Sequence, residues 1–282
     1  LTYNATEKLL FRAAYAKTYG RPDFPNIIPN ATIEENDIEF STDPNALPGT
    51  ISIRNTGLLP WSADNYDLSA EYYTDNGGLI TAGVFRKDIS DFFGTLQTIA
   101  TEEILNDFGL DPRYAGWRLN STINSGDARV SGAEFNVRQS LGVLGNWGRN
   151  LSVFANATKL RLQGSRTADF NRFIPVSANW GFTYTRRPIT FMAKWHHRGE
   201  QNRGPSTGQG PLAFVYQNPR TTMDINITYQ AFKRVSFFVN GRNITNVWFT
   251  QSRYQADTPV YARRSSTNSY GAQWAFGLKG TL

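Results

Sequence analysis

Side chains able to bind a ligand concentrate in or beside the longest irregular segments of the sequence. They are of two kinds, aromatic rings and arginines. Sugars and flat ligands stack on the faces of Trp and Tyr, and acidic ligands pair with guanidinium groups. The aromatic candidates are Trp61, Tyr114, Trp117, Trp248, Phe249 and Tyr254. The arginine candidates are Arg198 and Arg253, together with Arg203, Arg263 and Arg264.

Catalytic and metal-binding chemistry has little support in the sequence. The chain contains no Cys and only two His, His196 and His197. Adjacent residues of a strand point to opposite faces, so these imidazoles cannot bind one metal ion without breaking the pleat. A His beside an acid could serve a hydrolase, but no nucleophile motif accompanies it. We therefore expect no catalytic residue, no metal site and no cofactor.

Period-two alternation organises nearly the whole chain into strands. Between Tyr270 and Leu282, apolar residues such as Trp274 and Phe276 occupy one face, and polar residues or glycines occupy the other. The pattern predicts about ten strands, an even number as in bacterial membrane barrels. Their ranges are 8–19, 65–74, 79–88, 117–141, 151–162, 179–186, 189–198, 222–229, 235–245 and 270–282. We expect 117–141 to be one long strand with a bulge near Gly126.

Connection lengths alternate strictly along the chain. Short links follow Thr74, Leu141, Arg186 and Ala231. Long links cover residues 20–64, 89–116, 163–177, 199–221 and 246–269. In an up-and-down sheet this order places every long loop at one end, as outer-membrane barrels do with their extracellular loops. A Greek-key sandwich has little reason to follow it.

The composition agrees with a large β domain. The 282 residues are 40% hydrophobic and 14% aromatic. No run of about 18 apolar residues occurs, so a membrane-spanning helix is not expected. A spanning barrel needs no such run, because lipid-facing and lumen-facing residues alternate. The formal charge of +6 comes from basic residues scattered over strand ends and loops, which argues against a nucleic-acid-binding surface.

Several short motifs, each weak alone, together carry a family likeness across the chain. They are LFRAAYAKT (10–18) with RPDF (21–24), LP (59–60) leading into ADNYDLSAEYY (63–73), GVFRKDI (83–89), NSG (124–126) with GAE (132–134), NGRNITN (240–246) and the terminal strand. In combination they resemble the C-terminal half of the barrel in TonB-dependent outer-membrane receptors. This resemblance implies a fold and a function.

The implied fold is an all-β, antiparallel, up-and-down transmembrane β-barrel. Residues 1–282 would form the C-terminal portion of a single barrel domain, supplying about ten strands of about 22. In the family an N-terminal plug blocks the lumen, and a TonB box links it to the inner-membrane energy complex. We expect both to be missing from this sequence. The implied function is TonB-linked uptake of a glycan, an iron–siderophore complex or a vitamin across the Gram-negative outer membrane.

The resemblance also gives the loop residues a role. In such receptors the ligand lies between outer loops and plug, so the aromatic and arginine candidates would contact a small molecule or an oligosaccharide. Rings near strand ends can instead form the aromatic girdle that meets outer-membrane lipid. Inward charged side chains are expected to form a cross-strand ladder of Asp67, Glu71, Glu134, Arg138, Asp224 and Arg242. The alternatives are a small stand-alone barrel acting as a phospholipase or protease, a passive porin, and a soluble carbohydrate-binding sandwich.

Overall fold

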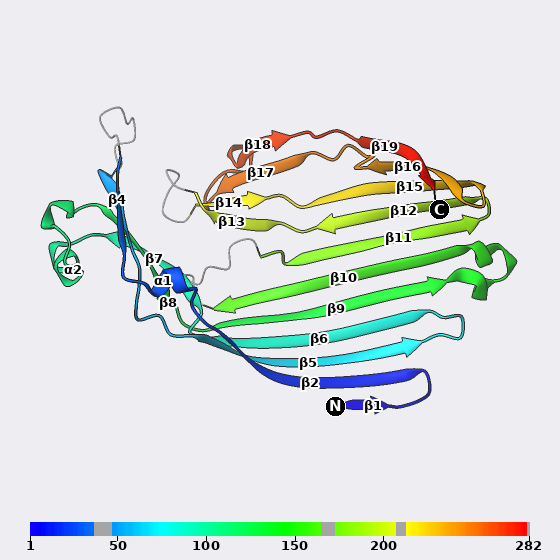
Figure 1. The fold of residues 1–282 in the computed structure, drawn as a ribbon, viewed down its shortest axis with the longest axis horizontal. Helices are drawn as coiled ribbons and strands as arrows, with labels where there is room; N and C mark the ends of the chain where they lie inside the picture. Colours follow the sequence, from blue (N-terminus) through cyan, green and yellow to red (C-terminus); the bar gives the residue numbers. More distant parts are fainter. Residues whose placement is uncertain (37–46, 165–172, 207–212, 281–282) are drawn as a thin grey trace.

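The computed structural model describes residues 1–36, 47–164, 173–206 and 213–280. Its dominant feature is an 11-stranded antiparallel sheet whose strands lie side by side in sequence order (Figure 1). These strands are β1 (Thr2–Asn4), β2 (Leu9–Gly20), β5 (Trp61–Tyr73), β6 (Leu79–Ser90), β9 (Ala128–Ser140), β10 (Leu151–Gly164), β11 (Val176–Arg186), β12 (Ile189–Arg198), β15 (Arg220–Phe232), β16 (Val235–Arg242) and β19 (Gln273–Gly280). The predicted all-β, up-and-down arrangement is confirmed.

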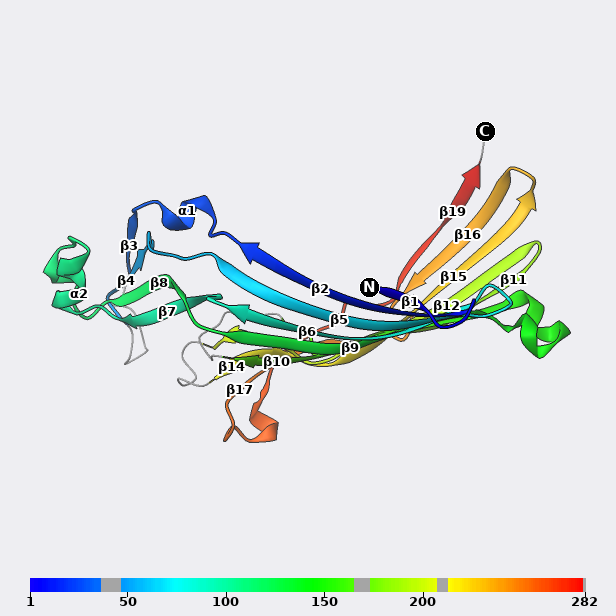
Figure 2. The same ribbon diagram turned by 90° about the horizontal axis from the view of Figure 1, so that it is seen from below.

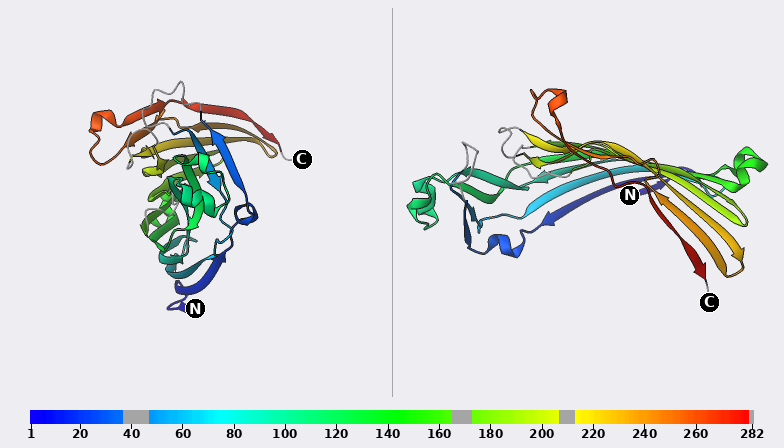
Figure 3. Two further views of the ribbon diagram at one scale, coloured as in Figure 1. Left: turned by 90° about the vertical axis from the view of Figure 1, so that its left-hand side faces the viewer. Right: turned by 90° about the horizontal axis from the view of Figure 1, so that it is seen from above.

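The main sheet is a single curved layer (Figure 2). Seen from the end that carries the long connections, it forms an open arc from β2 to β19 (Figure 3, left). Among the described residues β1 and β19 are its two edges, so this sheet is not closed. The side chains of Trp274 and Phe276 are 55% and 83% exposed rather than covered by a second sheet. A soluble sandwich would bury them.

Strand register gathers residues of one kind on each face. On the apolar face Tyr15 lies opposite Tyr66, and the rings of Trp180 and Trp195 stack with centroids 6.4 Å apart. On the polar face the Asn179 amide donates a 2.9 Å hydrogen bond to Asn156. A one-residue slip would exchange the two faces, so the alternation of the sequence fixes this register.

The predicted ladder of inward charges forms at two of its positions. Arg12 Nε donates to Glu71 Oε1 at 2.8 Å, and Lys194 Nζ lies 3.8 Å from Asp224 Oδ2. No ion pair involves the other four predicted members, Asp67, Glu134, Arg138 and Arg242, in the described part of the chain. Their charges therefore remain open to water on the polar face.

Phenylalanines on the polar face lie across glycines of the neighbouring strand. The pairs are Phe85 with Gly132, Phe154 with Gly181 and Phe238 with Gly277. A Cβ at any of the three glycines would come within 2.9 Å of the partner ring, so only glycine fits beneath it. Each ring thus reaches over the glycine of the neighbouring strand, which explains how apolar rings are accommodated on a polar face.

All long connections emerge from one end of the main sheet and the short turns from the other (Figure 1), as predicted. The long connections build two smaller sheets. The first loop sheet consists of β3 (Ala31–Glu35), β4 (Gly49–Ile53), β8 (Arg118–Asn124) and β7 (Phe93–Ile99). The second loop sheet consists of β13 (Gln201–Pro205), β14 (Phe214–Gln217), β17 (Phe249–Tyr254) and β18 (Arg264–Asn268).

Helical segments are short and lie in the connections. They are α1 (Phe24–Ile27), α2 (Glu102–Asp107) and the 3-10 turns η1 (Pro112–Tyr114), η2 (Leu141–Leu144), η3 (Asn146–Asn150) and η4 (Val260–Ala262). Among the described residues, no helix has the length and apolarity needed to cross a bilayer.

The prediction of one long strand over 117–141 is wrong. The segment divides into β8, in the first loop sheet, and β9, in the main sheet. Gly126 has φ +107°, and the neighbouring backbone is tied to Phe92, which accepts from Ser125 N at 2.7 Å and donates to Gly126 O at 3.0 Å. The chain therefore changes sheets here, and β8 pairs with β7 and, in parallel, with β4.

Two predicted strands extend beyond the strands that the structure describes. The strand predicted over 235–245 ends at Arg242, because Asn243 has φ +49° and leaves the extended region. Residues 281–282 of the predicted terminal strand, including Leu282, lie outside the described residues.

Candidate ligand-binding site

The predicted binding residues divide between the two loop sheets. Tyr114 and Trp117 belong to the first. The second contains Phe249, Arg253 and Tyr254. Arg198 ends β12 where that strand leads into the second loop sheet, Trp248 immediately precedes β17, and Trp61 begins β5. The folded chain therefore brings together Arg198, Trp248, Phe249, Arg253 and Tyr254, and separates them along the wall from Tyr114, Trp117 and Trp61.

In the first loop sheet the predicted rings form a hydrophobic core. Tyr114 is 8% and Trp117 9% exposed, and their rings meet edge to face with centroids 4.9 Å apart. Around them pack Ile51, Ile53, Ala100, Leu105 and Leu119. Burial of this kind stabilises the loop sheet by removing apolar area from water, and it leaves the two rings little surface for a ligand.

In the second loop sheet two half-buried rings stack beside charged neighbours. Tyr216, on β14, stacks on Tyr254 with centroids 4.2 Å apart and an interplanar angle of 21°. The guanidinium of Arg263 lies 4.7 Å from the centre of the Tyr254 ring, a cation–π contact. The Tyr254 hydroxyl donates a 3.2 Å hydrogen bond to Glu200 Oε1. Burial, followed by the nearby Glu200 carboxylate, raises the pKa of Tyr254 to about 12, so the phenol is neutral at physiological pH.

Two arginines face each other where the main sheet meets the second loop sheet. Arg198 on β12 is the register partner of Arg220 on β15, and both occupy the polar face. Arg198 Nη2 donates to Gln201 Oε1, and the Arg220 guanidinium lies 4.3 Å from the centre of the Phe249 ring. Among the described residues, Arg198 Nε and Arg220 Nη1 are buried and have no hydrogen-bond partner.

This arginine pair has the chemistry of an anion site. Like charges at facing strand positions repel each other, and a buried N–H without an acceptor costs free energy. Among the described residues neither guanidinium forms an ion pair with a carboxylate. A carboxylate, catecholate or phosphate oxygen between the two would relieve both penalties.

The remaining predicted residues lie around these groups. Trp248 is 56% exposed, and the side chains of Arg203 and Arg253 are also exposed. Arg264 Nε donates to Thr267 Oγ1 at 2.8 Å within the second loop sheet. The Trp61 ring packs 6.4 Å from the Phe92 ring at the other side of the wall.

Two residues of this region, Tyr216 and Arg220, are not among the candidates predicted from the sequence. Tyr216 lies in a loop strand too short to show period two, and Arg220 follows Pro219 before the strand predicted to begin at residue 222. A signal was nevertheless present for Arg220. If the strand predicted over 222–229 is continued back by two residues, Arg220 falls on the same face as Thr222. Pairing with the strand over 189–198 then places Arg220 beside Arg198 at the same end of the sheet.

The two histidines point to opposite faces, as predicted. His196 contacts Asn179, and its Nε2 lies 3.5 Å from Asp224 Oδ2 on the polar face. His197 Nδ1 lies 2.9 Å from Thr221 Oγ1 on the apolar face. Across the described ranges no group of three or more His, Cys, Asp or Glu residues is placed to hold a metal ion.

A curved wall with one apolar and one polar face, short turns at one end and ligand-type side chains on long loops at the other, defines the class of outer-membrane receptor barrels. The family model described as "TonB dependent receptor-like, beta-barrel" matches residues 1–244. The chain therefore belongs to the TonB-dependent receptor β-barrel family. Membership implies a location in the Gram-negative outer membrane. No curated protein matches the sequence.

Solved structures of this family share the fold. The ferric enterobactin receptor PfeA from Pseudomonas aeruginosa, in complex with enterobactin, aligns with a TM-score of 0.66 at 15% identity over 99% of this chain and 39% of its own. The siderophore receptor PirA from Acinetobacter baumannii gives 0.64 at 16% identity, covering 100% and 40%. The copper transporter OprC gives 0.62 at 14% identity, covering 100% and 38%. The chain thus spans about two fifths of the length of these proteins.

Proposed function

We propose that this chain contributes the wall and one ligand-binding face of a receptor for TonB-linked uptake of a small anionic iron chelate of the siderophore class. The observation that carries this proposal is the facing pair Arg198 and Arg220, each with a buried N–H that lacks an acceptor. Anionic oxygens are the partners that guanidinium groups bind most strongly, often through two parallel hydrogen bonds.

The rings beside the arginines suit a ligand with planar groups. Phe249, at the start of β17, lies under the Arg220 guanidinium. The stacked pair consists of Tyr254, at the end of β17, and Tyr216 on the neighbouring β14. Planar groups such as catecholates can continue this stack while their oxygens meet the arginines. On this proposal the long loops are extracellular, so the second loop sheet captures the ligand before it reaches the lumen.

The similar proteins are compatible with this ligand class. One structure contains enterobactin and another protein is a siderophore receptor. A copper transporter is also similar, but the described residues offer no cluster of metal ligands at the second loop sheet. A chelate whose metal is already enclosed needs anion and ring contacts rather than protein ligands to the metal. Energy coupling through a plug and the TonB complex is part of the proposal.

No specific observation supports the enzyme alternative or the porin alternative. His196 has an acid neighbour in Asp224, but that carboxylate also lies 3.8 Å from Lys194 Nζ, and no Ser forms a hydrogen bond with His196 among the described residues. A triad requires a nucleophile hydrogen-bonded to the His. We therefore keep uptake as the proposed function.

The test is uptake by cells that express the full-length protein. Ferric enterobactin, an anionic tris-catecholate complex, is compared with uncharged maltohexaose and with cyanocobalamin. We expect energy-dependent accumulation of the iron complex only, lost on addition of a protonophore. Replacing Arg198 and Arg220 together by Ala should weaken binding about 100-fold, since each charge-assisted hydrogen bond is worth roughly 1.5–3 kcal/mol. Uptake of an uncharged ligand that is indifferent to both substitutions would contradict the proposal.

A further inference from the structure

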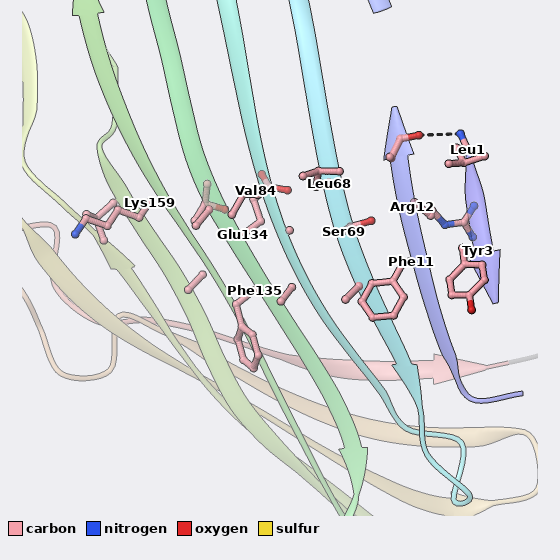
Figure 4. A pocket seen from close by; sticks show the side chains of 18 residues that line it. Leu1, Tyr3, Phe11, Arg12, Leu68, Ser69, Val84, Glu134, Phe135 and Lys159 are labelled. Carbon is pink, nitrogen blue, oxygen red and sulfur yellow. Dashed lines mark hydrogen bonds between the residues drawn. The ribbon is translucent and has the colours of Figure 1, made fainter. Parts of the chain in front are cut away.

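The apolar face carries a shallow groove across the first half of the wall. Its volume is about 770 Å³, and it crosses β2, β5, β6, β9 and β10 (Figure 4). Its floor consists of small side chains that lie between larger ones such as Phe11, Leu68, Val84 and Phe135. These small residues are Ala13, Ala70, Ala82, Ala133 and Ala157. Lys159 lies at one edge of the groove, and Phe11 and Tyr3 lie at the other (Figure 4).

Cations gather on the same face between this groove and the long loops. Register places Arg86 and Arg161 two residues beyond the groove, and Lys17 and Arg129 two residues further still. Two residues of a strand span roughly 7 Å, so these four cations lie roughly 7 to 14 Å along the strands from the groove. We call Lys17, Arg86, Arg129, Lys159 and Arg161 the basic band.

Acidic side chains neutralise only part of the basic band. Asp88 lies 2.8 Å from Arg86 and 2.5 Å from Arg129, and Asp64 accepts a 2.7 Å hydrogen bond from Tyr15. Five cations and two anions leave a formal charge of +3. In the described part of the chain no carboxylate pairs with Lys159 or Arg161, and both side chains are exposed.

The second half of the wall lacks such a band. On β11, β12, β15, β16 and β19 the loop-proximal positions of the apolar face carry no Lys, Arg, Asp or Glu. They are occupied by Ala178, Trp195, His197, Thr221, Met223, Gly241 and Trp274. An aromatic girdle would surround the barrel evenly. The coincidence of the groove and the basic band on one half therefore indicates a particular neighbour rather than the general requirements of a membrane wall.

We propose that the groove and the basic band bind a phosphate-bearing membrane lipid. An acyl chain fills the groove over the alanine floor, and the phosphate contacts Lys159, Arg161 and Arg129 at the loop side. Cations facing hydrocarbon are costly unless an anion neutralises them, and a lipid phosphate lies at the right depth to do so. A water-soluble anion would leave the adjacent apolar groove unexplained.

Native mass spectrometry of the full-length protein in detergent tests this proposal. Cardiolipin, which has two phosphates, and the zwitterionic lipid phosphatidylcholine are added separately. We expect bound cardiolipin and little phosphatidylcholine. Replacing Lys159 and Arg161 by Ala should weaken cardiolipin binding roughly 25-fold, because each cation near an anionic lipid contributes about a factor of five. Equal retention of both lipids would overturn the proposal.

Two further variants separate the band and the groove from general effects. Lys87→Ala with Arg138→Ala removes two cations from the polar face of β6 and β9 and should leave cardiolipin binding unchanged. Ala82→Phe with Ala157→Phe keeps every charge but fills the groove, and should weaken cardiolipin binding. Heat-modifiable migration on gels verifies that each variant is folded. If the polar-face variant loses as much lipid as the Lys159 and Arg161 variant, or if the filled groove has no effect, the site is not there.

Discussion

The two loop sheets are built from the same kind of segment but are stabilised differently. The first encloses a hydrophobic core in which Ile51 and Leu105 are fully buried. In the second, Gln201 and Ser252 are among the buried residues, and aromatic rings stack with arginines near the surface. A sheet with its own core can serve as a rigid support. The second sheet instead adjoins Arg198 and Arg220 of the main sheet, whose unsatisfied N–H groups impose a cost that a ligand can remove.

The largest expected effect is the loss of the core of the first loop sheet. Trp117→Ala should destabilise this sheet by about 3–5 kcal/mol, because the indole is buried and its removal leaves a cavity. Hydrogen exchange should then accelerate in residues 93–124 and remain slow in β9 and β10. Leu96→Ala is the control, since Leu96 is 39% exposed on the same sheet. Equal protection in the Trp117 variant and the wild type would show that the core does not hold this sheet together.

The opposite pattern is expected where the main sheet meets the second loop sheet. Arg220→Ala should weaken binding of ferric enterobactin by about tenfold or more, and should leave the thermal stability unchanged or higher, since it removes a buried N–H without a partner. Arg220→Lys keeps the charge but not the planar fork and should bind with intermediate affinity. Arg264→Ala, on β18 of the second loop sheet, is the matched control. If Arg220→Ala lost as much stability as the Trp117 variant, the proposed difference between the two regions would be wrong.

A smaller effect is expected for the stacked tyrosines. Tyr216→Ala should reduce affinity for the same complex by roughly 0.5–1.5 kcal/mol, the usual value of an aromatic pair. Tyr216→Phe should retain most of the affinity, because the ring rather than the hydroxyl makes the contact. Tyr261→Ala, at a ring that is 90% exposed in the connection after β17, should have no effect. Equal affinities for all three variants would show that the tyrosine stack does not contribute to ligand binding.

The smallest effect concerns the titration of one phenol. Because the pKa of Tyr254 is raised to about 12, its environment stabilises the fold below the ordinary tyrosine pKa of about 10, and this contribution is lost as the pH rises through about 12. The difference in absorbance at 295 nm between the wild type and Tyr254→Phe should therefore develop near pH 12. A difference that develops near pH 10 would mean that the ring is solvated.

The sequence predicted the wall well because the wall obeys one local rule. Alternation along residues 222–229 or 151–162 reports directly which side of the sheet each residue faces, and the pairing of sequence neighbours follows from short turns. The break at Gly126 was harder to interpret, because a glycine between two strand-like segments fits a bulge as well as a change of sheet.

The loop sheets could not be predicted in the same way. Their strands are only four to seven residues long, and irregular stretches separate them. In addition, β4 pairs with β8 across more than 60 residues of sequence. The sequence therefore identified Tyr114 and Tyr254 alike as loop aromatics. Only the fold separates the first, 8% exposed in a core, from the second, which stacks on Tyr216 beside Arg263.

The most direct test of the difference between the loop sheets is the position of a bound ligand. A crystal structure of the full-length protein with ferric enterobactin would locate the iron by its anomalous scattering. We expect iron beside the second loop sheet, with catecholate oxygens on Arg198 and Arg220. Iron seated against the first loop sheet, with both arginines still without an acceptor, would contradict this expectation.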